Sequence, residues 1–273
     1  MVKITRRKLL GIIAPAVALP LVDFYIIEPE LIVTCSSVEF KIGKLPSHLQ
    51  NYKVAHISDT HFGSTKLKII YDIVLSNLKS FRPNLIVYTG DLISKEEFIE
   101  DALKFAEDLA KIVPTYIVWG NWDHWSLGGK LKMFKDLLES ISEIRVLLNE
   151  NVEVEGGLYI IGVDDPYTMH DDFEKAMPKA KEAMYISLAH SPEIIGKTAN
   201  KVDIIFTGHT HGGQIILPII GPIYVPLPSK YRAYISELFK VNETYMYVTR
   251  GIGTSILPVR FMCPPEVVQA KLM

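Results

Sequence analysis

Seven candidate metal ligands lie in five short segments, each of which follows a run of β-branched and apolar residues. In chain order the segments are Asp59-x-His61, Gly90-Asp91, Gly120-Asn121, His190 and Gly208-His209-Thr210-His211. Carboxylate, imidazole and amide ligands in this combination suit a pair of divalent ions that share one carboxylate. Each short pair on its own is typical of a turn, and a lone histidine is more often a buried structural residue. Five such segments in one order favour a dinuclear metal centre.

The order and chemistry of these residues suggest how they would divide between two ions. Asp91 is the expected bridging carboxylate, because it is short, charged and central in the order. Asn121 offers a neutral carbonyl oxygen, and His209 and His211, two residues apart, can each serve a different ion. A glycine precedes three of the ligands, and a residue without a side chain lets the backbone turn sharply beside a metal.

The elements that must position these residues follow an alternating pattern from residue 52 onward. Strands are predicted at 54–58, 85–88, 115–119, 152–154, 158–163, 185–189, 203–206, 215–217, 245–249 and 267–271, after a pair of short strands at 31–34 and 38–42. Helices are predicted at 65–79, 96–111, 127–141 and near 192–197. The ligand segments then fall at the carboxyl ends of strands, where sheets of α/β proteins bind ligands. The predicted fold class is α/β, a four-layer α/β/β/α sandwich of two mixed sheets with flanking helices, in one domain.

The composition is that of a globular protein with a sizeable core. Of 273 residues, 48% are hydrophobic and 22% are charged, and the formal net charge is −2. Four basic residues and no acidic residue precede Asp23, so the rest of the chain is acidic and offers no basic stripe for nucleic acid. Cys35 and Cys263 are too far apart for a Cys-x-x-Cys site, and two unpaired buried thiols are favoured over one disulfide.

Residues 1–27 are interpreted as a twin-arginine-like export signal or membrane anchor, and residues 28–273 as the main domain. Arg6 and Arg7 precede an apolar stretch at 9–22, which is broken by a glycine and two prolines and is short for a bilayer span. The Ala-Val-Ala sequence at 16–18 could be a cleavage site. The alternative is a basic, apolar helix that packs on the domain.

Taken together, the five segments resemble the motif series of the calcineurin-like metallophosphoesterase family, and of its prokaryotic branch with an amino-terminal signal or anchor. The resemblance runs from about residue 28 to the carboxyl end, and its most specific parts are 208–216 (GHTHGGQII) and 250–265 (RGIGTSILPVRFMCPP). It implies one metal held by Asp59, His61, Asp91 and His211, and another held by Asp91, Asn121, His190 and His209. Two ions about 4 Å apart would then activate a bridging hydroxide for in-line attack on phosphorus, which makes Asp91 catalytic as well as metal-binding.

One position departs from the family pattern. Trp122 stands where the family usually has a histidine that assists the phosphoryl oxygens or the leaving group. His124 is the candidate replacement as a catalytic acid, and a general acid contributes on the order of 10²–10⁴ in rate. Trp122 could stack on a substrate or pack at the strand end. Arg250 and Arg260 are candidate phosphate contacts or, alternatively, structural ion-pair partners.

These features predict a phosphoric ester hydrolase that depends on two divalent metal ions, which could be Mn²⁺, Fe²⁺ or Zn²⁺. The expected substrate is a phosphodiester or phosphomonoester, which could be lipid-linked. One alternative is a lipid-linked nucleoside-diphosphate pyrophosphohydrolase similar to the UDP-2,3-diacylglucosamine hydrolases, which also lack the motif histidine. The other is a non-catalytic metal-binding scaffold with the same fold, against which the intact ligand set argues.

Expected partners and location follow from the amino terminus. A membrane surface is an expected partner, nucleic acid is not, and no protein partner is predictable from the chain. The protein is expected to be exported or membrane-anchored, at the outer face of the cytoplasmic membrane. A cytoplasmic location is expected instead if the leader is not functional.

Overall fold

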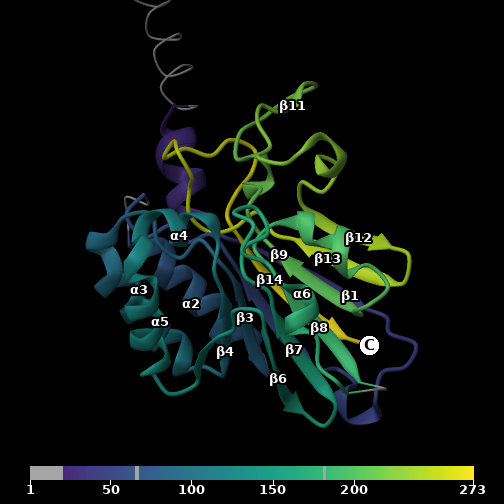
Figure 1. Cartoon of the computed structure of the whole chain (residues 1–273). Helices are drawn as coiled ribbons and strands as arrows, with labels where there is room; N and C mark the ends of the chain where they lie inside the picture. Colours follow the sequence, from purple (N-terminus) through teal and green to yellow (C-terminus); the bar gives the residue numbers. More distant parts are fainter. Residues whose placement is uncertain (1–20, 65–67, 181–182) are drawn as a thin grey trace, which may run out of the picture.

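The strands form two six-stranded sheets in the computed structural model, which describes residues 21–64, 68–180 and 183–273 (Figure 1). The first sheet has the spatial order β1 (Thr34–Phe40), β14 (Glu266–Leu272), β2 (Lys53–Ile57), β3 (Leu85–Thr89), β4 (Thr115–Val118) and β5 (Ile144–Val146). The second has the order β12 (Glu237–Val241), β13 (Thr244–Val248), β9 (Ile204–Thr207), β8 (Met184–Leu188), β7 (Leu158–Gly162) and β6 (Glu150–Glu155). Each sheet contains parallel and antiparallel pairs, so both are mixed, as predicted.

Helices cover the outer face of each sheet. The helices α2 (Ile69–Phe81), α3 (Ile99–Ala110) and α5 (Leu131–Glu139) pack on the first sheet, and the short α6 (Phe173–Ala176) and α7 (Ile195–Thr198) pack on the second. Successive residues of β2 show the layering, because Ala55 packs in the core under the helices while Val54 packs in the core between the sheets. This alternation is the period-two pattern of a strand buried on both faces. The predicted four-layer α/β/β/α sandwich is therefore confirmed.

The carboxyl ends of the central strands meet at one edge of the sandwich. The loops after β2, β3 and β4 leave the first sheet there, and the loops after β8 and β9 leave the second. All five predicted ligand segments lie in these loops or in the first turn that follows them. A small antiparallel hairpin, β10 (Ile216–Leu217) and β11 (Gly221–Pro222), extends from the same end of the molecule (Figure 1).

Several elements differ from the prediction, and among them β5, α6 and β11 were not predicted at all. The predicted strand pair at 31–34 and 38–42 is one strand, β1, which pairs in parallel with the carboxy-terminal β14. The helix α4 (Asn121–Leu127) begins directly after β4, where a loop was expected, because the Asp123 carboxylate accepts the Gly120 N–H at its amino end. The edge strand β12, which the sequence pattern does not reveal, pairs with β13.

Cys35 is exposed and Cys263 buried, and both are free, so the expectation of two buried thiols is wrong for Cys35.

The amino-terminal end of the described chain packs on the body of the molecule. A π-helical segment, η1 (Asp23–Leu31), spans the predicted boundary between residues 27 and 28. The Glu28 carboxylate is buried and accepts the backbone N–H groups of Met262 and Cys263. Most of the predicted signal or anchor, residues 1–20, lies outside the described residues, and its role stays a prediction. Within the described ranges, no helix combines the length and the apolar character that a membrane crossing requires.

Candidate metal centre and its surroundings

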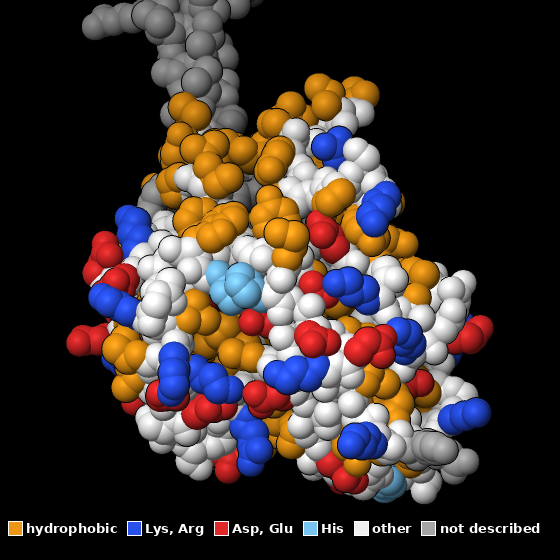
Figure 2. Space-filling model, viewed as in Figure 1, with side chains coloured by type: hydrophobic (Ala, Val, Ile, Leu, Met, Phe, Trp, Pro, Cys, Tyr) orange, Lys and Arg blue, Asp and Glu red, His pale blue; other side chains and the backbone are white. Residues whose placement is uncertain are grey.

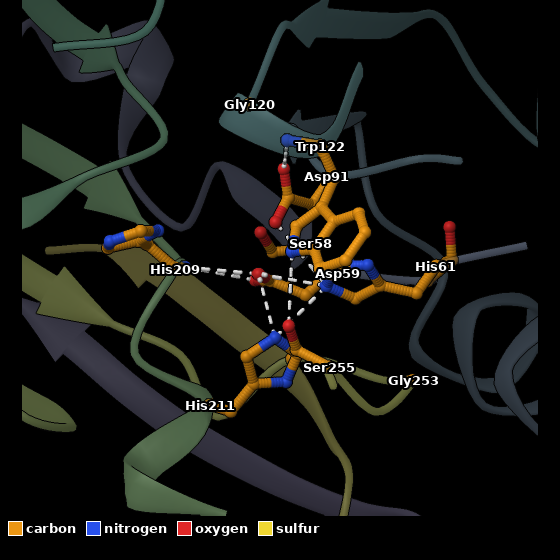
Figure 3. Close-up of polar contacts among 12 residues, drawn as sticks. Ser58, Asp59, His61, Asp91, Gly120, Trp122, His209, His211, Gly253 and Ser255 are labelled. Carbon is orange, nitrogen blue, oxygen red and sulfur yellow. Dashed lines mark hydrogen bonds and ion pairs between the residues drawn. The ribbon is translucent and has the colours of Figure 1, made fainter. Parts of the chain in front are cut away.

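The five loops bring the seven predicted ligands together, and all seven are buried. Figure 3 shows Asp59, His61, Asp91, His209 and His211. On one side, His61 Nε2 lies 3.3 Å from Asp91 Oδ2 and 3.0 Å from His211 Nε2. His211 Nε2 in turn lies 3.4 Å from Asp59 Oδ1. Two imidazole nitrogens and two carboxylate oxygens therefore converge on a single point.

A second group of donor atoms lies on the other side of Asp91. His190 Nε2 is 3.2 Å from Asp91 Oδ2 and 3.2 Å from His209 Nδ1. Asn121 is buried, and within the described part of the chain its side-chain oxygen has no hydrogen-bond partner. A buried amide oxygen without a partner is costly, and a bound cation would satisfy it. Asp91 belongs to both groups, as expected of a bridging carboxylate.

The backbone at the ligands is held in a conformation that ordinary residues avoid. Five ligands have left-handed φ values between 48° and 71°: Asp59, His61, Asp91, His209 and His211. Residues in this region cost of order 1–3 kcal/mol each and concentrate at functional sites. Strained backbone in these loops therefore turns the ligand side chains toward one centre.

Two glycines allow the loops to approach one another closely. A Cβ atom at Gly120 would collide with Asp91 and with the ring of His190. A Cβ atom at Gly208 would collide with Ser58 and with the carboxylate of Asp59. The glycines expected to permit close approach do so by leaving room for the ligands of neighbouring loops.

Hydrogen bonds orient the rings of His190, His61 and His209 toward the centre. The Nδ1 atom of His190 lies 2.7 Å from the carbonyl oxygen of Thr89, and Nδ1 of His61 lies 2.8 Å from Oγ of Ser94. The Nε2 atom of His209 lies 3.0 Å from the carbonyl oxygen of Pro226. The opposite nitrogen of each ring is therefore the one presented to a metal, as is usual for histidine ligands.

Burial and the neighbouring charges set the protonation of the cluster. Burial lowers the pKa of His61 to about 4 and that of His209 to about 3, so both rings are neutral near pH 7. Burial raises the pKa of Asp59 to about 7. Burial alone would also raise the pKa of Asp91, but the adjacent His190 and His61 outweigh it and hold this pKa at about 2. Burial alone would lower the pKa of His190, but the adjacent Asp91 and Asp59 raise it well above the ordinary value. A bound cation would displace this proton, and the neutral rings of His61 and His209 complete a donor set that fits a divalent cation.

Asp123 is a structural residue of the site that the sequence analysis missed. Its Oδ1 accepts the backbone N–H groups of Leu92 and Ile93 at 2.9 and 3.1 Å, and its Oδ2 accepts that of Gly120 at 2.9 Å. One carboxylate therefore ties the loop that follows Asp91 to the turn that presents Asn121. An acidic residue two positions after Asn121 was the only signal in the sequence, and spacing alone does not reveal such a bond.

A cavity of about 430 Å³ opens above the ligands, and Trp122 lines it together with Trp125 and Tyr167. The backbone N–H of Trp122 donates to Asp91 Oδ1 at 2.8 Å, and its indole N–H donates to Ser255 Oγ at 3.1 Å. Trp122 therefore lies beside Asp91 and on the wall of the cavity. Its contact with a substrate stays a prediction.

His124 lies in a neighbouring hollow that shares Trp125 and Tyr167 with the main cavity. Its Nε2 lies 2.8 Å from Asp164 Oδ1, and its ring stacks on that of His170. Burial alone would lower the pKa of His124, but the bond to Asp164 and the nearby carboxylates raise it above the ordinary value. The acid role of His124 stays a prediction, with Asp164 as its partner. Asp165 instead shapes the following turn through Tyr167 and Thr168.

The predicted phosphate contacts of Arg250 and Arg260 are replaced in the structure by contacts to the protein itself. Arg260 is fully buried, and its guanidinium group donates to the carbonyl oxygens of Arg250, Gly251, Gly253 and Cys263. Arg250 donates to Glu266 Oε1 at 3.1 Å and to Thr34 Oγ1 at 2.8 Å. Neither residue lines the cavity above the ligands. The alternative role as structural ion-pair partner describes Arg250, and Arg260 organises the loop beside His211.

Comparisons with known proteins agree with this geometry. A family model described as calcineurin-like phosphoesterase matches residues 52–213. An uncharacterised metallophosphoesterase of Aquifex aeolicus is 31% identical over 82% of this chain and 86% of its own length. The uncharacterised metallophosphoesterase YkuE of Bacillus subtilis is 28% identical over 88% and 85%, and the phosphodiesterase YaeI of Escherichia coli is 27% identical over 81% and 82%.

A solved structure supports the fold. The crystal structure of a protein from Thermus thermophilus matches with a TM-score of 0.52 at 12% identity, over 74% of this chain and 91% of that one. At that identity the likeness concerns the fold alone. The family model matches more than half of the chain. The structure adds the buried Asp/His cluster and the two-sheet sandwich. The chain belongs to the calcineurin-like metallophosphoesterase family and is a metal-dependent phosphoesterase.

Proposed function

We propose that the cluster holds two divalent ions that share Asp91. Asp59, His61, Asp91 and His211 would hold one ion, and Asp91, Asn121, His190 and His209 the other. The observation that carries this proposal is the position of Asp91 Oδ2, which lies 3.3 Å from His61 Nε2 and 3.2 Å from His190 Nε2. Mixed nitrogen and oxygen donors suit Mn²⁺, Fe²⁺ or Zn²⁺.

The residues around the centre have separate tasks in the proposed reaction. Bound ions would polarise the phosphoryl oxygens of the substrate and lower the pKa of a water molecule. Asp91 is kept in its charged form by the adjacent His190 and His61, which lower its pKa to about 2, and the Trp122 N–H fixes its other oxygen. His124, held by Asp164, is the proposed proton donor to the leaving group.

The proposed reaction is hydrolysis of a phosphodiester, with phosphomonoesters as the second class. The relative YaeI is named a phosphodiesterase, which supports this order. The tryptophan at the motif position bears on the leaving group instead, because an enzyme without the usual histidine favours esters with good leaving groups. We further propose that the enzyme works at the outer face of the cytoplasmic membrane, on the strength of the paired Arg6 and Arg7 before an apolar stretch.

The test is hydrolysis of bis-p-nitrophenyl phosphate and p-nitrophenyl phosphate by metal-free protein, with Mn²⁺, Fe²⁺ and Zn²⁺ added back one at a time. We expect metal-dependent turnover with the diester preferred, and loss of turnover in Asp91→Asn. Lys132→Ala, which changes an exposed residue of α5, is the control and should retain activity. Hydrolysis that persists in Asp91→Asn would contradict the proposed role of the shared carboxylate.

A further inference from the structure

Exposed apolar side chains from three segments gather at one end of the molecule (Figure 2). They belong to η1, to the β10–β11 hairpin and to the loop at 255–262, and we call them the apolar rim. Tyr25 and Ile26 represent η1, Ile219 and Ile220 the hairpin tip, and Ile256 and Leu257 the loop. Contiguous apolar surface of this kind marks an interaction site on a soluble domain.

Direct contacts hold the three segments together as one surface. The backbone N–H of Arg260 donates to the Phe24 carbonyl oxygen at 3.1 Å, which joins the loop to η1. The backbone N–H of Ile216 donates to the Phe261 carbonyl oxygen at 2.9 Å, which joins the hairpin to the same loop. The rim is therefore a built surface with a fixed position relative to the metal ligands.

Two exposed isoleucines of the rim adopt a backbone conformation that β-branched residues avoid. Ile219 has φ 71° and is 109% exposed, and Ile256 has φ 62° and is 78% exposed. Glycine or asparagine suits this left-handed region far better. Isoleucine at both positions lowers the stability of the fold in water. Its apolar side chain stabilises the protein only if the rim is covered.

The charges around the rim identify what covers it. Residues 214–228 contain no charged side chain, and the only charged residue in 255–262 is the buried Arg260. Exposed Lys230 and Arg232 lie eight and ten residues after β11. In η1, Glu28 and Glu30 are buried, and Asp23 is the half-buried acidic residue. Twenty residues precede Leu21 in the sequence, and they include four basic and no acidic residues. An apolar surface bordered by basic residues is the pattern of a protein that binds an anionic lipid bilayer.

The cavity above the metal ligands opens into this rim. Ile223, Tyr224, Ile256 and Leu257 form its apolar side, while Asp91 and His209 lie among the residues at its floor. A ligand in this cavity would place a phosphate at the ligands and an apolar group against the rim. Apolar walls with a few convergent polar groups are typical of a small-molecule site.

We propose that the apolar rim docks on an anionic bilayer and that the substrate is a phosphoester of a membrane lipid. The inference rests on the proposed function and adds its substrate class. In the reaction the oxygen of a water molecule forms a new bond to phosphorus, and the ester P–O bond breaks. The leaving alcohol takes up the proton that the water loses, so no further reactant is needed. The lipid phosphate reaches the ligands while its apolar chain stays along the rim side of the cavity.

The experiment compares two diesters that share one leaving group. Methyl p-nitrophenyl phosphate is supplied in solution, and hexadecyl p-nitrophenyl phosphate in vesicles of phosphatidylcholine and phosphatidylglycerol. The full chain is used with whichever of Mn²⁺, Fe²⁺ or Zn²⁺ best supports hydrolysis of the methyl diester. We expect kcat/KM for the hexadecyl diester to be higher by at least about tenfold, the change expected from burying only two methylene groups.

A rim variant separates docking from catalysis. Ile219→Asn with Ile220→Ser removes the hairpin tip from the rim, and asparagine suits the backbone at position 219. Neither residue lines the cavity, so hydrolysis of the methyl diester should be unchanged. Turnover of the hexadecyl diester in vesicles should fall about tenfold. Met133→Gln with Leu137→Gln, which changes two exposed apolar residues of α5, is the matched control and should retain both activities.

The outcomes distinguish this proposal from the function on which it rests. Equal kcat/KM for the two diesters would overturn the lipid substrate while leaving the phosphodiesterase intact. No hydrolysis of either diester with any metal would overturn both. A rim variant with full activity on vesicles would overturn docking, and a change from dimer to monomer in its sedimentation would make the rim an interface between two copies.

Discussion

The Oδ2 atom of Asp91 lies 3.2 Å from the Nε2 atom of His190, although the two residues come from different sheets. Asp91 follows β3 of the first sheet, and His190 follows β8 of the second. The Thr89 carbonyl oxygen, 2.7 Å from His190 Nδ1, fixes the ring in this position. The metal centre is thus built across the interface of the two sheets, so the packing between the sheets sets the distances among the ligands.

The first prediction concerns the room beside Asp91. Gly120→Ala should lower kcat for bis-p-nitrophenyl phosphate by about 100-fold, because the new methyl group displaces Asp91 and His190 and such misplacement costs about this much. Gly129→Ala is the matched control, since a Cβ atom there meets nothing within 4 Å and activity should not change. Circular dichroism would establish that both variants fold. Wild-type activity in folded Gly120→Ala would show that the close approach is unimportant.

The second prediction concerns the residue that orients His61. Ser94→Ala removes the hydroxyl group 2.8 Å from His61 Nδ1 and leaves every proposed ligand in place. Loss of such an orienting contact typically weakens metal affinity by 10–100-fold, and we expect about that change. Titration of metal-free protein with Mn²⁺ measures it. Ser140→Ala, on an exposed turn after α5, should leave the affinity unchanged, and equal affinities for all three proteins would remove the orienting role of Ser94.

The third prediction concerns His124, the candidate replacement for the histidine that is absent at the position of Trp122. If His124 donates a proton to the leaving group, His124→Ala should slow esters of poor alkoxide leaving groups by about 100-fold and p-nitrophenyl esters much less. Asp164→Asn should shift the same ratio in the same direction, because it removes the carboxylate that holds His124. Rates on a series of aryl and alkyl diesters measure the effect. Equal losses across the series would assign His124 a structural role.

The fourth prediction is a pH dependence of stability from the ion pair between half-buried Arg250 and buried Glu266. Burial alone would raise the pKa of Glu266, but Arg250 and hydrogen-bond donors outweigh it and hold the pKa below the ordinary 4.5. A lowered carboxyl pKa stabilises the fold above the unfolded value, and this contribution disappears as pH falls through the folded value. Glu266→Gln should therefore cost about 3 kcal/mol of unfolding free energy at neutral pH and progressively less in acid.

Urea unfolding across the pH range measures this difference. Glu243→Gln breaks only an exposed pair with Lys240, and its cost should stay below about 1 kcal/mol at every pH. A deficit in Glu266→Gln that remained constant into acid would show that the carboxylate charge is not what stabilises this region.

The sequence predicted which residues gather at this edge, because each follows a strand that is easy to recognise. Asp59, Asp91 and Asn121 come directly after apolar runs, and such strand ends meet at one edge of a sheet. Their left-handed backbone could not be predicted, because aspartate and histidine rarely adopt it without tertiary constraint. The bonds of Asp123 to the loop after Asp91 join segments about thirty residues apart, which no local pattern records.

The surroundings of Arg260 differ from those that the sequence predicted. A basic residue in a segment specific to the family is a reasonable candidate for phosphate binding, yet its guanidinium group is buried among backbone carbonyl oxygens. Sequence alone does not distinguish a loop that curls around its own arginine from a loop that presents it to a ligand. The parallel pairing of β1 with β14 was missed for a related reason, since the partners lie at opposite ends of the chain.

Electron paramagnetic resonance of Mn²⁺ titrated into metal-free protein tests the central claim most directly. If Asp91 is shared by two ions, the spectrum at saturation should show exchange coupling between them, with two Mn²⁺ bound per chain. Asp91→Asn should instead give the resolved hyperfine pattern of isolated Mn²⁺. An uncoupled spectrum from wild-type protein, with one ion bound at saturation, would contradict a dinuclear centre built on Asp91.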